Sequence, residues 1–238
     1  MDADNRRSVR RRMAANCVPL LLLSAAVVSP AKPAYVDRLN HAAATLREIM
    51  QAPDQAIPQE LMDRSACIVI VPGVKKAGFF VSAKYGKGYV SCRRKAAPGW
   101  TAPASVTVEG GGFGFQIGAS ETDVVMLIMN QRGMQRLFTS QFTLGADASV
   151  AAGPVGRSAS ALTDAFMTAE VLSWSRTRGV FAGAALQGAT LRQDVDDNQE
   201  LYGKPLDNRD IIEKGVAVPK AARKLIALLD RYSSRRTT

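Results

Sequence analysis

The sequence is poor in the side chains that carry most catalytic and metal chemistry. Its 238 residues include one histidine, His41, and three cysteines, of which only Cys67 and Cys92 lie beyond the N-terminal segment. A structural zinc site usually takes four cysteine or histidine ligands, and a serine or cysteine nucleophile needs a neighbouring base. The sequence therefore predicts neither a cofactor nor an enzyme active site.

Aromatic side chains are also few, at 6% of the chain. Proteins that bind single-stranded nucleic acid stack bases on aromatic rings beside basic residues, and only Tyr85, Tyr89 and Trp100 lie near the main basic stretch. Nucleic acid is therefore not an expected partner. The glycine-rich segment 110–118 lacks the lysine and serine or threonine that close a nucleotide-binding loop, and its alternating apolar residues predict a strand.

Long hydrophobic runs are missing as well, and the one at the N-terminus is short. Five arginines precede an apolar run from Cys17 to Val28, and the small residues Ser29 to Ala31 follow it. This order predicts a signal peptide at residues 1–31, because the run is too short for a comfortable membrane span; an uncleaved anchor is the alternative. We therefore expect an exported protein, periplasmic or secreted, that associates peripherally with a membrane.

Export bears on the two remaining cysteines. An oxidising compartment permits a disulfide between Cys67 and Cys92, and two buried free thiols are the alternative. A disulfide requires the two Cβ atoms to lie roughly 4 Å apart, which a sequence does not reveal. The sequence leaves both states open.

The charges are unevenly distributed along the chain. The net charge is +10, of which residues 1–31 carry +3, so +7 remains for the rest. Residues 64–108 contain eight basic and no acidic side chains, and residues 214–238 contain seven basic side chains and one acidic. Such segregation favours an anionic surface as the partner.

The eight basic residues of 64–108 form the first basic cluster. Whether they all lie on one surface depends on the strands that carry them. A hairpin turn is predicted at residues 85–88, and Pro72-Gly73 is predicted to end a buried strand. Lys75, Lys76 and Lys87 would then lie at turns that share one end of the sheet. Alternation along strands would instead scatter the cluster over two faces.

The remaining patterns predict an α+β fold. Helices are expected at residues 35–51, 58–62, 131–138, 208–214 and 219–232. Strands are expected at residues 67–71, 78–84, 88–93, 105–108, 123–130, 146–152, 170–175 and 180–186. Asp194 and its neighbours predict a helix N-cap better than a calcium loop. The last helix is amphipathic, which fits docking on the core or, as the alternative, a membrane-surface helix.

No internal repeat or long linker interrupts these elements. The fold class is therefore α+β, with a single domain at residues 35–232 and a basic tail at 233–238. Its antiparallel sheet is expected to curl into a sandwich or barrel-like form, flanked by the N- and C-terminal helices.

A series of short motifs runs through the chain in a specific order. It includes Tyr85-Gly86-Lys87-Gly88, Gly114 to Gly118, Ala152 to Arg157 and Ser173 to Gly188. Together these motifs resemble the SYLF-domain family over residues 61–229. The resemblance implies a β-rich domain that binds phosphoinositides and other membrane lipids, and actin in fungal members, with no catalytic residues to transfer.

The predicted lipid-contacting residues are the basic side chains of the first cluster and of the Ser173 to Gly188 stretch. They are Lys75, Lys76, Lys84, Lys87, Arg93, Arg94, Lys95, Arg176 and Arg178. The family usually has lysines where Arg176 and Arg178 stand, and a glutamate where Gln187 stands. We expect non-enzymatic binding of anionic phospholipid or a membrane surface. The alternative is a structural envelope protein that binds an acidic protein or a cell-wall polymer.

Overall fold

The computed structural model describes most of the chain beyond the N-terminal segment. The described residues are 32–78, 81–113, 118–155, 168–177, 179–184 and 186–233. The predicted signal peptide, Arg157 and Arg178 lie outside them. The residues from Lys32 onward form one compact unit.

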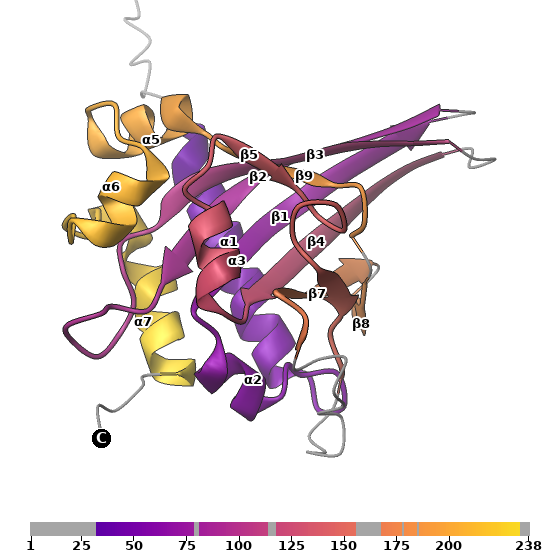
Figure 1. Ribbon diagram of the computed structural model, residues 1–238, viewed down its shortest axis with the longest axis horizontal. Coiled ribbons are helices and arrows are strands. Elements are labelled where there is room, and N and C mark those ends of the chain that lie inside the picture. The colour runs from indigo at the N-terminus through magenta and orange to yellow at the C-terminus, as the bar shows by residue number, and fades with distance from the viewer. Residues whose placement is uncertain are drawn as a thin grey trace, which may run out of the picture. The chain divides into compact units, whose positions relative to one another are not determined.

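This unit combines helices and strands throughout its length (Figure 1). In chain order the elements are α1 (Ala34–Gln51), α2 (Gln59–Arg64), β1 (Cys67–Gly78), β2 (Val81–Cys92), β3 (Ala104–Phe113), β4 (Gly118–Ile128), α3 (Gln131–Arg136), β5 (Gln141–Thr143), β6 (Val150–Ala152), β7 (Val171–Thr177), β8 (Val180–Gly183), β9 (Thr190–Gln193), α5 (Val195–Tyr202), α6 (Asn208–Glu213), the 3-10 helix η2 (Lys220–Ala222) and α7 (Arg223–Tyr232). Within the described ranges, no helix is both long enough and apolar enough to cross a membrane.

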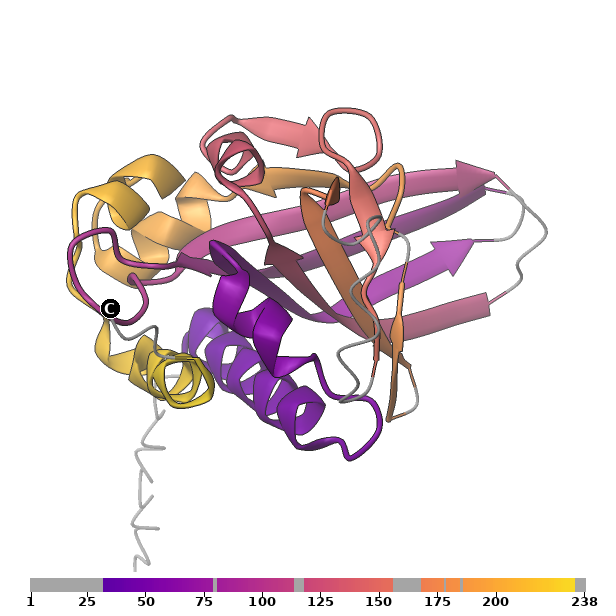
Figure 2. The same cartoon turned by 60° about the horizontal axis from the view of Figure 1, so that its bottom comes forward.

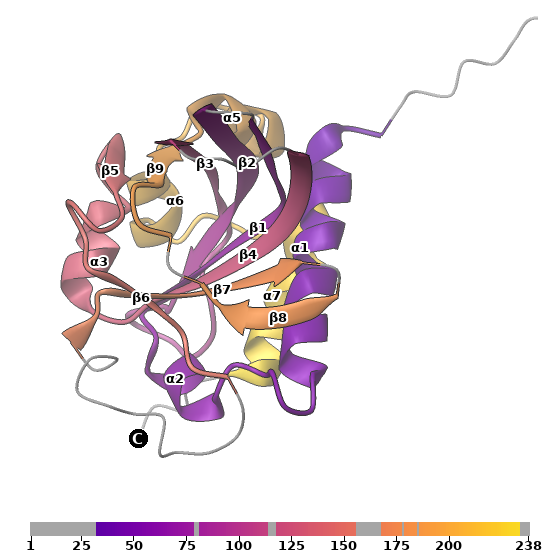
Figure 3. The same cartoon turned by 90° about the vertical axis from the view of Figure 1, so that its right-hand side faces the viewer.

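The described strands form one sheet in the order β5-β9-β3-β2-β1-β4-β7-β6, with β8 paired to β7. Every pairing is antiparallel except that of β6 with β7, which is parallel. Figure 3 shows the sheet curling, with α1 and α7 along one flank and α3 on the other. The predicted α+β class with a curled, mostly antiparallel sheet between terminal helices is confirmed.

The sheet is buried on both faces, because successive side chains of a strand point to opposite sides. Ile68 and Ile70 of β1 pack on the face covered by α1 and α7, which we call the α1 face. Val69 and Val71 pack on the opposite face with residues of α3 and α6. On the α1 face the apolar side of α7 is buried against α1, so the prediction that this helix docks on the core is confirmed.

The prediction of a hairpin turn at residues 85–88 is wrong. Strands β1 and β2 pair from Cys67 opposite Cys92 to Gly78 opposite Ser82, so residues 85–88 lie inside a strand and the chain reverses beyond Gly78. A Cβ on Gly88 would clash with the backbone carbonyl of Ile70, so this glycine permits close packing and not a turn.

The prediction that Pro72-Gly73 ends the first strand is also wrong. β1 continues to Gly78, and between Ile70 and Lys75 it contains one residue more than the paired stretch of β2. Gly73 takes a positive φ of 61° within this bulge. Lys75, Lys76 and Lys87 therefore lie within strands, and the turns expected at these positions are not there.

The short strands are the hardest elements to predict from the sequence. The strand expected at 146–152 is reduced to β6, and the one expected at 170–175 continues to Thr177 as β7. β5 and β9 pair with each other but have three and four residues, too few to show a period. The expected N-cap is confirmed: Asp194 accepts a hydrogen bond from the Asp197 N–H at 3.0 Å.

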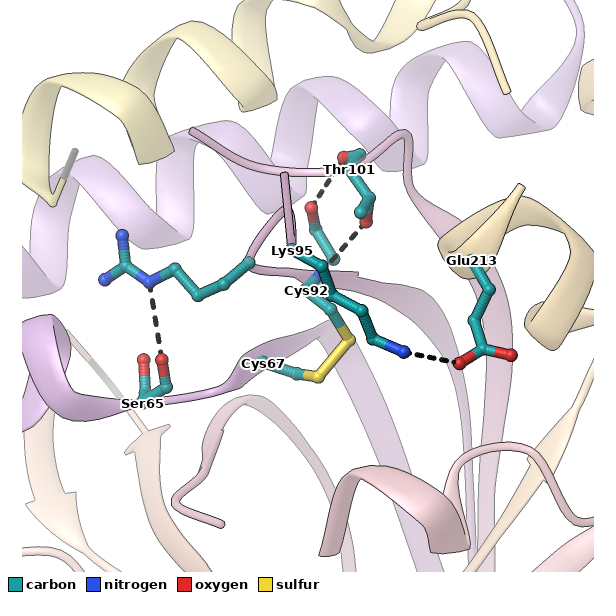
Figure 4. The surroundings of a disulfide bond; sticks show 8 residues. Ser65, Cys67, Cys92, Lys95, Thr101 and Glu213 are labelled. Atoms are coloured by element: carbon teal, nitrogen blue, oxygen red, sulfur yellow. Dashed lines mark hydrogen bonds and ion pairs between the residues drawn. A yellow bond between two sulfur atoms is a disulfide. The ribbon is translucent and has the colours of Figure 1, made fainter. Parts of the chain in front are cut away.

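Cys67 and Cys92 form a disulfide between directly opposite residues of β1 and β2 (Figure 4). Both residues are fully buried. Of the two states that the sequence leaves open, the structure therefore contains the disulfide. It joins the two strands at the end of the sheet that α2, α6 and α7 surround (Figure 1).

Candidate binding surfaces

The predicted lipid-contacting residues are divided among three places. Lys76 lies opposite Lys84 in the β1–β2 register, and both face away from α1. Lys75, Lys87 and Arg176 are on the α1 face, whereas Arg93, Arg94 and Lys95 follow the far end of β2. Arg178 lies outside the described residues. The sheet therefore does not bring these residues together as one patch.

The bulge in β1 decides which lysine reaches which face. Strict alternation from Ile70, on the α1 face, would place Lys76 on that face as well. The extra residue shifts the pattern, so that Lys75 shares the α1 face with its neighbours Tyr85 and Glu121. The bulge therefore places Lys75, and not Lys76, on the α1 face.

A groove of about 680 Å³ lies between α1 and the α1 face of the sheet. α1 contributes one stripe of residues at helical spacing, and β1, β2, β4 and β7 contribute the other wall. The lining residues are Ala34, Asp37, Arg38, His41, Ala44, Thr45, Glu48, Pro72, Gly73, Lys75, Tyr85, Gly86, Lys87, Glu121, Asp123 and Arg176. The groove is thus a charged cleft between a helix and four strands.

At one end of the groove, two ion pairs connect α1 and β2 to α5. Arg38 contacts both carboxylate oxygens of Asp197 at 2.6 and 2.7 Å, and Lys87 contacts Asp194 at 2.7 Å. Arg38 also donates to the Tyr89 hydroxyl at 3.4 Å. Since Asp197 is only 3% exposed, the Arg38–Asp197 pair is part of the folded core.

The ion pairs shift the ionisation of their members. Burial opposes the charged form of Asp194, but hydrogen bonds from Lys87, the Asp197 N–H and the Thr107 hydroxyl outweigh it and lower the pKa of Asp194. Burial likewise opposes the charge on Lys87, but Asp194 and Asp197 outweigh it and raise the pKa of Lys87. Both groups are therefore charged at neutral pH, and Lys87 is engaged within the protein.

At the other end of the groove, Arg176 is held between two carboxylates. It contacts Asp123 at 2.5 and 2.9 Å and forms a second ion pair with Glu48 of α1. The Gly73 N–H of the bulge donates to the other oxygen of Asp123 at 2.8 Å. The guanidinium of Arg176 therefore fastens β7 to β4 and α1.

The residues that follow β2 are also engaged in internal contacts. Arg93 donates to the carbonyls of Met62 at 2.8 Å and Ser65 at 3.3 Å, and its guanidinium stacks 4.1 Å from the Trp100 ring. Arg94 donates to the Trp100 carbonyl at 2.8 Å. The dashed line in Figure 4 marks the ion pair of Lys95 with Glu213, at 2.9 Å. Arg93 and Lys95 thus connect the end of β2 to α2 and α6, and Arg94 holds the loop at Trp100.

Two of the motifs that carry the family resemblance, 152–157 and 173–188, meet around Trp174. Its indole N–H donates to the Pro154 carbonyl at 2.9 Å, and a Cβ on Gly153 would clash with the indole ring. A Cβ on Gly183 would clash in turn with the Gly153 carbonyl. The described parts of the 152–157 and 173–188 motifs therefore hold β6, β7 and β8 together, which is a structural role.

The sequence does not predict that the acidic residues of the groove form one site. It offers Glu121 and Asp123 as candidate carboxylates without a special spacing, indicates only capping for Asp194 and its neighbours, and does not single out Glu48. One signal was present: Asp37 or Arg38, His41, Thr45 and Glu48 follow helical spacing beside the apolar stripe of α1. Their partners on β2, β4, β7 and α5 lie far away in sequence and could not be assigned from it.

Fold and site together define a class of protein: a single α+β domain in which, among the described residues, charged side chains pair with one another across a groove between a helix and a sheet. In the part of the chain that the structure describes, no three histidine, cysteine or acidic side chains gather to hold a metal. Over residues 109–232 the chain matches the model of the Ysc84 family, described as "Las17-binding protein actin regulator". The chain belongs to this family, which is also known as the SYLF-domain family, so the resemblance seen in the sequence is confirmed at this level.

Curated relatives come from fungi and mammals. The chain is 33% identical over 182 residues to protein YSC84 of Saccharomyces cerevisiae, 35% over 179 residues to SH3 domain-containing protein PJ696.02 of Schizosaccharomyces pombe, and 30% over 200 residues to SH3 domain-containing YSC84-like protein 1 of Bos taurus. These matches cover 74%, 74% and 82% of the chain, but 38%, 41% and 58% of the respective relatives. The chain therefore corresponds to one part of these longer proteins.

Proposed function

We propose that the protein is a non-enzymatic module that binds anionic lipid at a membrane surface through β1 and β2. The observation that carries the proposal is the position of Lys76 and Lys84, directly opposite each other on the face away from α1. Like charges at such positions destabilise a sheet, and an anionic surface would relieve their repulsion.

The expected strength is modest. A basic side chain close to an anionic membrane contributes about 1 kcal/mol, and the attraction decays over roughly 8 Å at physiological salt. Lys76 and Lys84 share one face of the sheet. Lys87, Arg93 and Arg176 contact carboxylates or carbonyls of the protein, so they add little to the attraction. Binding should therefore be salt-dependent.

Export of the protein, with removal of residues 1–31, is part of this proposal. The Cys67–Cys92 disulfide supports it, because disulfides form and persist in oxidising compartments. The family description names Las17 and actin as partners of other members. An exported chain would instead meet the anionic phospholipids of its own envelope.

Co-sedimentation of the purified protein with vesicles tests the proposal. The protein should bind vesicles that contain anionic lipid, should not bind vesicles of phosphatidylcholine alone, and should be released from the anionic vesicles as salt rises. The double variant Lys76→Glu/Lys84→Glu should lose this binding and still unfold at the same temperature. The matched control Arg47→Glu/Lys204→Glu, with the same change in net charge at exposed positions elsewhere, should still bind.

Two results would contradict the proposal. If the folded Lys76→Glu/Lys84→Glu protein binds as the unmodified protein does, β1 and β2 are not the contact. If no vesicle is bound at all, an acidic protein or cell-wall polymer becomes the leading partner.

A further inference from the structure

The groove beside α1 differs in charge from the rest of this basic protein. Its lining contains four carboxylates, Asp37, Glu48, Glu121 and Asp123, and four cations, Arg38, Lys75, Lys87 and Arg176. Asp194 and Asp197, which pair with Lys87 and Arg38, add two further negative charges. Six carboxylates thus stand against four cations, although the whole chain carries +10.

The surplus of carboxylates lies at the end of the groove that is formed by β4 and the bulge of β1. There Arg176 is shared by Asp123 and Glu48, which leaves one charge of that group uncompensated. Among the described residues, Glu121 has neither an ion pair nor a hydrogen bond of its side chain. Lys75 lies directly opposite it on β1, so three carboxylates at this end of the groove stand against two cations. Glu121 and Asp123 also line a second hollow of about 390 Å³, shared with Arg176 and Gly179. The exposed Glu121 is therefore accessible from both hollows, whereas both oxygens of Asp123 are engaged by Gly73 and Arg176.

The bulge builds this acidic end. The Gly73 N–H holds Asp123, and the Glu121 carboxylate lies over the same glycine, since a Cβ there would come within 2.7 Å of Glu121 Oε1. The positive φ of Gly73 and the absence of its side chain thus place two carboxylates side by side at the groove.

An aromatic ring completes the lining. Tyr85 lies opposite Lys75 in the β1–β2 register, lines the groove and is 48% exposed, which is unusual for a large side chain in the middle of a sheet. The face of a tyrosine ring attracts an organic cation, and carboxylates bind an ammonium by charge-assisted hydrogen bonds.

From this geometry we propose that the groove is a binding site for an organic cation with a primary ammonium group. The ammonium binds Glu121 and its neighbours at the β4 end, and the carbon chain lies along the groove toward Tyr85, over the aliphatic stem of Lys75, which lies between these two residues in the sheet. A volume of about 680 Å³ falls in the range of small-molecule sites. The site is distinct from the lysines of the opposite face and selects the opposite charge.

Titration calorimetry of the purified full chain with spermidine tests the site. Because the protein is strongly basic overall, its general field repels this cation, and measured binding must come from a local acidic site. Glu121→Gln should weaken spermidine binding by about tenfold or more, whereas Glu200→Gln, with the same charge change on an exposed part of α5, should change it less than about twofold.

Two outcomes would overturn the site: no spermidine binding by the unmodified protein, or equal binding by both variants. The source of the ammonium is decided with phosphatidylcholine vesicles with and without phosphatidylethanolamine, both uncharged overall. Co-sedimentation that requires phosphatidylethanolamine and Glu121 assigns the site to a lipid headgroup. Spermidine binding without vesicle binding assigns it to a soluble amine. Binding of anionic vesicles through Lys76 and Lys84 should be unaffected by Glu121→Gln, so this test and that of the proposed function fail separately.

Discussion

The two ends of strands β1 to β4 are built in different ways. At the end that contains the disulfide, helices pack on both faces, and Cys67, Cys92 and Ile128 are fully buried. At the other end the strands continue beyond the helices (Figures 1 and 2), and Ala77, Ala83 and other small residues are exposed. Packing and ion pairs hold the first end, whereas the second relies mainly on hydrogen bonds between strands. We call them the covered end and the bare end.

Basic side chains have different roles at the two ends. At the covered end Lys87 and Arg93 are bound by carboxylates or carbonyls of other elements, so they stabilise the fold. On the bare side Lys84 lies opposite another lysine and next to glycine, so it adds repulsion and little packing. A count of positive charges along the sequence therefore overstates the surface that is available for an anionic partner.

The largest expected difference between the two ends comes from Asp197→Ala. This change leaves the guanidinium of Arg38 partly buried without its carboxylate, and breaking a buried ion pair costs about 3–5 kcal/mol of the free energy of unfolding. Denaturant unfolding measures the loss. The exposed neighbour Asp196→Ala, in the same first turn of α5, should cost less than about 1 kcal/mol. Equal losses in the two variants would show that the pair does not stabilise the covered side.

The second-largest effect is expected from acid, which should lower the stability of the covered end. The pKa of Asp194 is lowered in the folded protein, so its contribution is present above the unfolded pKa of about 3.9 and is lost as the pH falls through the lower, folded value. The free energy of unfolding, measured by denaturant between neutral pH and strong acid, should therefore drop below about pH 4. Asp194→Asn keeps an N-cap residue and should show a smaller drop. An identical pH profile for that variant would contradict the assignment.

The smallest effect is expected at the bare end. Lys84→Gln removes one of two like charges that lie directly opposite each other, so the free energy of unfolding should stay within about 0.5 kcal/mol of the original value, with any change toward higher stability. Thermal unfolding at low salt is the sensitive measurement. A clear loss of stability would mean that Lys84 is held in place as Lys87 is, and that the contrast between the two ends is wrong.

The sequence predicts the long elements well, because their periods are long enough to read. The stripe of α1, the buried run of β1 and the cap at Asp194 follow from local rules. It does not predict the β1–β2 register. A glycine such as Gly88 can either form a turn or permit close contact with Ile70, and the sequence does not distinguish the two. The sequence does not predict the groove either, because its ion pairs join residues such as Arg38 and Asp197, which are separated by 159 positions.

The disulfide also affects how the protein would respond to proteolysis. It closes the chain between Cys67 and Cys92 into a covalent ring, and the strand residues of the bare end on β1 and β2 belong to that ring. A protease that cuts the ring once opens it without releasing a fragment, because the two new ends remain joined through the sulfur atoms. The nicked protein would run as a single chain until a reductant separates it into two pieces. The part of the sheet with the least packing would thus be the part whose cleavage does the least damage.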